Sequence, residues 1–177
     1  SGNWSTSVDN WDHGFVARQV WPNTTNDQAI FRTSAGTVDL LSDITLGEIL
    51  IDGVDNYTLG STPETQSLNF GGTADIKVDK VTATFRAGIT GSPDLDAYVA
   101  NPDKVNLYPE SVDMALGQTT LGGAGNNGKL YLGGSTAGNT IDSILKENNY
   151  AFLYKTGAST WTVGDVDVGI CYLQGGK

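Results

Sequence analysis

The sequence predicts an all-β protein, with a short parallel β-helix (β-solenoid) as the first interpretation and a β-sandwich or jelly roll as the alternative. Three observations indicate this class. The 177 residues include 23 glycines. Only 17% of the residues are charged, which is unlike a long-helix or disordered protein. Short apolar stretches bounded by Gly, Asn, Asp and Ser recur at intervals of about ten residues, a spacing that fits either a sandwich or the turns of a solenoid.

Alternation of apolar and polar residues defines the strands. Val38 and Leu40 fall on one face of the first example, and Leu130 and Leu132 on one face of a later one. The predicted strands are Ala29–Thr33, Thr37–Leu41, Glu48–Ile51, Asn56–Leu59, Ser67–Phe70, Asp75–Val78, Val81–Arg86, Val105–Tyr108, Lys129–Leu132, Ala151–Lys155, Thr160–Val163 and Gly169–Leu173. The stretch Ile141–Glu147 has the only helical signal, enough for one or two turns.

The length fits a single all-β domain over residues 1–177. We expect an N-terminal cap at 1–28, β rungs at 29–86 and further rungs at 111–177. Between them, Ala87–Glu110 contains three prolines and several aspartates. This composition predicts an irregular excursion, a loop that protrudes from the β scaffold and presents a binding surface.

The charge excludes some partners. Ten basic and twenty acidic residues give a net charge of −10, which repels nucleic acid and anionic membrane surfaces. No apolar window is long enough to insert into a membrane. The one cysteine, Cys171, lies in an apolar run and is expected to be buried. These features favour an extracellular or cell-surface location, or the exterior of a virion.

Clustered carboxylates suggest one candidate ligand, Ca²⁺, which binds six to eight oxygen atoms. The first candidate group is Asp94 and Asp96 with Asp103 and the neighbouring Asn101. A second pair is Asp165 and Asp167. The ordinary alternative is that these are solvated carboxylates on loops.

Aromatic residues in or beside loops suggest a second ligand class. Tyr98, Tyr108 and Tyr150 could stack on sugars or contact another partner. Covering the edge of the core is their more ordinary role. The only histidine, His13, has no nucleophile marked beside it, and one histidine with one distant cysteine cannot form a standard zinc site. We therefore expect no catalytic activity and no cofactor other than calcium.

Both ends of the chain resemble the β-solenoid repeats of bacterial autotransporter passenger domains. The N-terminal likeness consists of Asn3-Trp4-Ser5, Asn10-Trp11, Asn26–Phe31, Gly36-Thr37-Val38, Ile44–Gly47 and Tyr57-Thr58-Leu59. The C-terminal likeness consists of Lys129–Gly134, Gly138–Ile141 and Leu153–Val163, which is similar to an "L-x-K-x-G-x-G-T-W-T-L" repeat core. The resemblance implies stacked rungs, with Trp4, Trp11 and Trp21 covering the N-terminal end and Trp161 inside the core.

The resemblance also implies a function. Passenger-type solenoids are extracellular, so we expect a non-catalytic structural or adhesive protein, a surface or appendage subunit whose open ends allow self-assembly. Its partners would be copies of itself or glycans. Two alternatives stay open: a carbohydrate-binding module or small polysaccharide-active enzyme, and a viral capsid decoration or tail protein.

Overall fold

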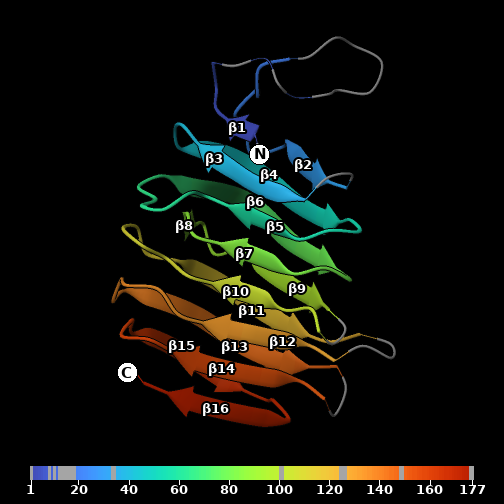
Figure 1. Ribbon diagram of the computed structural model, residues 1–177, viewed down its shortest axis with the longest axis vertical. Coiled ribbons are helices and arrows are strands. Elements are labelled where there is room, and N and C mark those ends of the chain that lie inside the picture. Colours follow the sequence, from blue (N-terminus) through green and yellow to red (C-terminus); the bar gives the residue numbers. More distant parts are fainter. Residues whose placement is uncertain are drawn as a thin grey trace.

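The chain folds into a stack of parallel β-strands with about six turns, and no helix is present among the described residues (Figure 1). The computed structural model describes residues 2–7, 9, 11, 19–32, 35–99, 102–123, 127–147 and 150–175. Consecutive strands mostly alternate between two sheets, and the ladder pairs within each sheet are parallel. The β-solenoid prediction is confirmed, and the sandwich alternative is wrong because hydrogen-bonded neighbours come from successive turns.

The two sheets run the length of the stack. We call the first sheet I; it contains β1 (Gly2–Trp4), β3 (Gly36–Leu40), β5 (Tyr57–Leu59), β7 (Ala83–Phe85), β10 (Val105–Leu107), β12 (Lys129–Leu132), β14 (Phe152–Thr156) and β16 (Ile170–Gln174). Sheet II contains β2 (Gln28–Phe31), β4 (Ile44–Asp52), β6 (Ser67–Asp79), β9 (Asp94–Tyr98), β11 (Ala115–Leu121), β13 (Asn139–Lys146) and β15 (Trp161–Val166), with β8 (Gly88–Thr90) paired to β6.

The turns are uneven in length. In sheet I, Gly36 pairs with Tyr57, Tyr57 with Ala83 and Ala83 with Val105. Successive partners are therefore 21, 26 and 22 residues apart along the chain. Because no fixed period runs through the chain, the register cannot be obtained from a repeat length.

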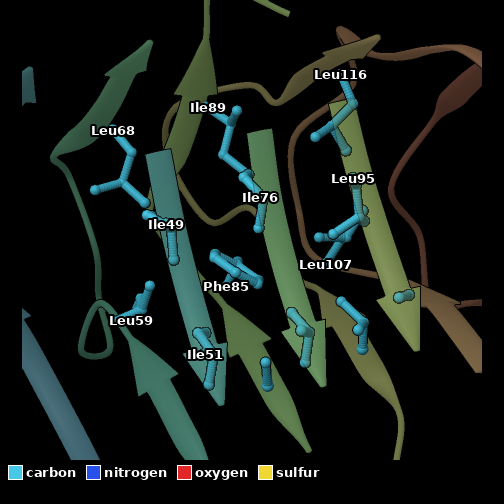
Figure 2. Close-up of a cluster of buried hydrophobic side chains, with 14 of the residues drawn as sticks. Ile49, Ile51, Leu59, Leu68, Ile76, Phe85, Ile89, Leu95, Leu107 and Leu116 are labelled. Atoms are coloured by element: carbon cyan, nitrogen blue, oxygen red, sulfur yellow. The ribbon is translucent and has the colours of Figure 1, made fainter. Parts of the chain in front are cut away.

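The core lies between the sheets and is built from in-register rows of inward side chains (Figure 2). One row in sheet II runs through Ile49, Ile76, Leu95, Thr119 and Ile144, all of them buried. The facing row in sheet I runs through Leu59, Phe85, Leu107, Leu132, Lys155 and Leu173. Each inward side chain thus packs against its equivalents in the turns above and below.

The predicted excursion at Ala87–Glu110 is wrong, because this segment supplies β8, β9 and β10. Leu95, Ala97 and Val105 within it are fully buried. Its prolines precede or follow strands: Pro93 comes directly before β9, and Pro109 lies two residues after β10. Proline cannot donate to a strand ladder but fits the corners between strands, so these prolines mark corners of a regular turn.

The helical signal at Ile141–Glu147 is also wrong, since most of this stretch lies in β13. Ile141 and Ile144 face the core, with Ile141 paired to Leu116 and Val163 and Ile144 paired to Thr119 and Val166. Burial against the neighbouring turns on both sides overrides the local helical spacing.

A cluster of aromatic rings closes the N-terminal end. The ring centroids of Trp4 and Trp21 are 5.1 Å apart, and the Trp11 ring lies 4.8 Å from Trp4 and 4.7 Å from Trp21. Phe31, on the first strand of sheet II, contacts the rings of Trp4 and Trp11. Trp4 is fully buried, so the cluster covers the first turn and shields it from water.

One buried amide joins three turns near the other end. Asn139 Oδ1 accepts hydrogen bonds from the Met114 amide at 3.0 Å and from Thr136 Oγ1 at 2.9 Å. Its Nδ2 donates to the carbonyls of Thr136 and Thr160. All the hydrogen-bonding groups of this side chain are used, which satisfies its burial and fixes the corner between sheet I and sheet II.

Removing one inward ring tests the stacked core. Phe85 is fully buried between Leu59 and Leu107, so we expect Phe85→Ala to lower the free energy of unfolding by about 3–5 kcal/mol. The matched control is Thr58→Ala on the outer face of β5, expected to change that energy by less than about 0.5 kcal/mol. Urea denaturation measures both, and equal losses would contradict this arrangement of the core.

Candidate functional site

The open C-terminal end of the solenoid exposes apolar side chains that the other turns bury. β16 pairs with β14 on one edge, and no described residue pairs with its other edge. Its inward positions, Cys171 and Leu173, continue the core row that includes Leu153 and Lys155. Leu173 is nonetheless 77% exposed, and Val166, which pairs with the buried Ile144 in sheet II, is 49% exposed. The expectation that Cys171 is buried is wrong: this residue is exposed on the edge strand β16.

The backbone at this end also faces outward. In earlier turns, the residue that follows an inward-facing residue donates its backbone N–H to a carbonyl of the preceding turn. Examples are Tyr108 N to Phe85 O at 2.8 Å and Gly133 N to Leu107 O at 2.9 Å. Backbone groups alternate in direction along a strand. In β16, Tyr172 therefore points its backbone groups toward β14. Those of Cys171 and Leu173 point toward the open end, where a further strand would pair with them.

A ladder of stacked tyrosines leads to the same end on the outer face of sheet I. Tyr131, Tyr154 and Tyr172 occupy equivalent positions in β12, β14 and β16. Their ring centroids are 4.3 Å and 4.8 Å apart, with interplanar angles of 8° and 12°. Burial, and then the neighbouring Tyr131 and Tyr172, raise the pKa of Tyr154 above its usual value.

The two ends of the tyrosine ladder differ. Lys104, which directly precedes β10, places its Nζ 4.9 Å from the ring centroid of Tyr131 and so covers the first ring. Tyr172 is the last ring and is 41% exposed. The ladder therefore ends on an aromatic face that is open to a further ring.

A lysine occupies a core position close to the open end. Lys155 is 6% exposed and stands in register between Leu132 and Leu173. Its Nζ donates to the carbonyls of Thr156 at 2.9 Å and Gly157 at 3.3 Å. Burial lowers the pKa of this amine, because the charged form loses its hydration.

The predicted calcium ligands are not brought together. Asp94 and Asp96 lie on the outer face of β9, whereas Asp103 lies in the turn before β10 and accepts a hydrogen bond from Thr82 Oγ1. Asn101 is outside the described residues. Asp96 faces a different environment from Asp94: burial, and then the charge of Asp75, raise its pKa.

The second acidic pair is remote from the first. Asp165 shares a row of sheet II with Asp94 but stands three strands away, about 14 Å along the stack. Asp167 forms an ion pair with Lys146 at 2.6 Å. Across the described part of the chain, no three His, Cys, Asp or Glu side chains are grouped closely enough to hold a metal ion.

The three predicted partner-binding tyrosines also occupy separate places. Tyr98 lies on the outer face of sheet II, where burial first and then Asp96 raise the pKa of its hydroxyl. Tyr150 precedes β14 and is 63% exposed. Tyr108 lies at the corner after β10 and lines a groove of about 450 Å³.

That groove runs along the corners that follow the sheet I strands. Besides Tyr108 it is lined by Arg86 and Glu110, which form an ion pair, and by Ser135. Glu110 also accepts hydrogen bonds from Thr62 Oγ1 and from the Glu64 amide, so its carboxylate is held in place. The groove combines one aromatic ring with fixed polar groups. His13 lies outside the described residues.

The tyrosine ladder lies outside the predicted binding residues, yet the sequence contains a signal for it. The three rings stand at the same place in Lys129-Leu130-Tyr131-Leu132, Phe152-Leu153-Tyr154-Lys155 and Ile170-Cys171-Tyr172-Leu173. Aligning these strands on their shared pattern would have placed the tyrosines in one column.

Comparisons with protein-family models, with curated proteins and with solved structures found no match to this chain. The resemblance to autotransporter passengers therefore stays a prediction. Among the described residues, none forms a helix long and apolar enough to cross a membrane.

Replacing Lys155 tests whether burial of its amine lowers the stability of the fold. We expect Lys155→Met to raise the free energy of unfolding at pH 7 by about 1 kcal/mol, because it keeps the packing and removes a buried charge. The pKa of Lys155 in the folded chain lies below its ordinary value of 10.5. At a pH between the folded-state pKa and 10.5, the unfolded chain binds more protons than the folded chain, so the stability of the wild type rises with pH. The advantage of Lys155→Met should therefore shrink as the pH approaches 10.5.

The control for this variant is Lys80→Met. Lys80 makes an exposed ion pair with Asp79, which contributes little to stability. Denaturation at several pH values measures both variants. A Lys155→Met protein less stable than the wild type at pH 7 would contradict the cost assigned to the buried amine.

Proposed function

We propose that this chain is a non-catalytic, extracellular structural or adhesive protein that self-assembles by strand pairing, with the exposed edge strand β16 as the candidate contact. The observation that carries the proposal is the edge strand β16, whose five residues are all exposed although two occupy core positions. An unpaired strand edge with apolar side chains is a template for pairing with another β-structure.

The contrast between the two ends supports a directed assembly. Aromatic rings cover the N-terminal turn, and Trp4 there is fully buried. At the C-terminal end Leu173 and Val166 are open to solvent. Association by the C-terminal end alone removes apolar surface from water, which is the dominant favourable term in protein association.

The charge distribution supports the same direction. The outer face of sheet II carries Glu48, Asp75, Asp94 and Asp96, with Lys77 bound to Glu48 and Asp75. With a net charge of −10, copies of the chain repel one another side to side. β16 itself has no charged residue, whereas β15, the last strand of sheet II, carries Asp165, so this repulsion acts least at the edge of β16. The acidity also suits an extracellular location.

A charge placed on the open end tests assembly. Leu173→Lys should weaken self-association at least about tenfold, because burying a leucine contributes roughly 1.5–3 kcal/mol and the lysine must be desolvated instead. Light scattering over a concentration series, at about 0.15 M salt, measures the association.

Val54→Lys is the matched control, since Val54 is 85% exposed in the turn before β5, far from the open end along the stack. It should associate like the wild type. Wild-type chains that stay monomeric at every concentration, or a Val54→Lys variant as impaired as Leu173→Lys, would count against assembly through this end.

A second candidate function is carbohydrate binding, and one observation favours it. The groove at Tyr108 places an aromatic ring beside the fixed Arg86–Glu110 pair and the hydroxyl of Ser135. A ring that stacks on a sugar face, next to donors and acceptors for its hydroxyls, is a common means of binding glycans.

A glycan array tests this second function. Any glycan bound by the wild type should lose at least about tenfold in affinity with Tyr108→Ala, because the stacking surface is removed. Tyr150→Ala serves as the control, since Tyr150 does not line the groove. Full binding by Tyr108→Ala would exclude the groove as the glycan site.

A further inference from the structure

We propose that the groove at Tyr108 binds a neutral, linear oligosaccharide whose chain runs parallel to the solenoid axis, so that successive sugar units lie at the corners of successive turns. This inference rests on carbohydrate binding by the groove and specifies the class of glycan and its direction. Three features of the groove support it: its extent along the stack, its balanced charge and the position of its aromatic ring.

The groove extends over the corners of five consecutive turns. Its lining includes Pro63 after β5, Arg86 after β7, Tyr108 after β10, Gly133 after β12 and Gly157 after β14. These strands are successive neighbours in sheet I, so the four spacings of about 4.8 Å give a length of about 19 Å along the axis. Because an extended chain of pyranose rings advances about one ring per strand spacing, the groove accommodates about four sugar units.

The charges of the groove cancel. Among its described lining residues only Arg86 and Glu110 are charged, and their side chains form an ion pair. An acidic sugar would find no unpaired cation there, and the net charge of −10 would repel it. A neutral glycan meets no such repulsion, and its hydroxyls can donate to the carboxylate and accept from the guanidinium.

The ion pair also holds its hydrogen-bonding groups in place. Glu110 Oε1 accepts from Thr62 Oγ1 at 3.1 Å, and Glu110 Oε2 accepts from the Glu64 amide at 3.2 Å. Arg86 contacts Glu110 through one nitrogen, and no other described side chain accepts from this guanidinium, which has five N–H donors. Donors are therefore left for the hydroxyls of a ligand, beside a carboxylate that cannot turn away.

The aromatic ring of the groove is positioned by a glycine of the next turn. A Cβ on Gly133 would lie 2.5 Å from both Cδ1 and Cε1 of Tyr108, so the ring occupies space that only a glycine leaves free. No other described ring stacks on Tyr108, in contrast to Tyr131 and Tyr154, which stack on each other. Tyr108 therefore offers a ring to a sugar at the middle of the groove, with two corners on either side.

Titration of the full chain with oligosaccharides of defined length tests this inference. The probes are neutral linear oligomers of glucose, mannose and xylose, from single sugars up to about six units, and uronate oligomers of the same lengths. We expect at least one neutral series to bind, with an affinity that rises up to about four units and then stays constant, because the groove ends there. Uronate oligomers should bind at least about tenfold more weakly.

The Gly157→Asn variant tests the direction of the chain. It places a side chain at one end of the groove, where only the Gly134 carbonyl oxygen lies within 4 Å of the added Cβ. Asparagine tolerates the φ of +67° at this position, so the fold should be kept. The variant should lose the affinity gained by the longest oligomers and bind short ones like the wild type.

The Gly133→Ala variant tests the position of the ring. Its methyl group displaces Tyr108, so oligomers of every length should bind at least about tenfold more weakly. Gly2→Ala is the matched control, because its added Cβ meets nothing within 4 Å, and it should bind like the wild type. If Gly133→Ala does not fold, Gly157→Asn still decides the test.

The outcomes separate this inference from the function on which it rests. Binding that is independent of oligomer length, or Gly157→Asn binding equal to the wild type at every length, overturns the axial direction but leaves carbohydrate binding intact. Uronate oligomers that bind more tightly than neutral ones overturn the neutral class. If no oligosaccharide binds the wild type, the inference and carbohydrate binding by the groove both fail.

Discussion

A single turn of this solenoid cannot bury its own apolar face, and the rest of the structure depends on that constraint. Each inward side chain is covered by its equivalents in the turns on either side, as Phe85 is by Leu59 and Leu107. The apolar side chains of a turn are therefore buried wherever the turn has another turn on each side. The ends lack one neighbour. Tryptophan rings cover the first described turn, and Leu173 in the last described turn is exposed.

Much of the fold could be predicted because strand signals are local. Alternation of apolar residues located β3, β12 and most other strands, and glycine content indicated the all-β class. The errors have a common physical cause. Prolines at the corners of a turn give the segment the composition of a loop, although Leu95 and Val105 between them are buried. The spacing of β13 looked helical, because only pairing with adjacent turns, invisible without the register, decides its conformation.

The candidate site was harder to predict because it depends on register. Asp94 and Asp165 look like parts of one acidic surface in sequence, yet they stand on strands three places apart. The tyrosines expected to bind a partner were those near loops, whereas the stacked column ending at Tyr172 comes from strand centres. The apolar neighbours of Cys171 predict burial, but its exposure is decided by its place on the edge strand β16, which the local sequence does not reveal.

The proposed assembly makes the exposed edge of β16 the surface through which the chain joins another. Amide hydrogen exchange followed over a range of protein concentrations tests it most directly, because exchange reports the pairing of individual backbone groups. If β16 pairs with another chain, the amides of Cys171 and Leu173 become protected as concentration rises, while those of β3, far from β16 along the stack, do not change. Exchange at β16 that stays equally fast at all concentrations would rule out pairing at this edge.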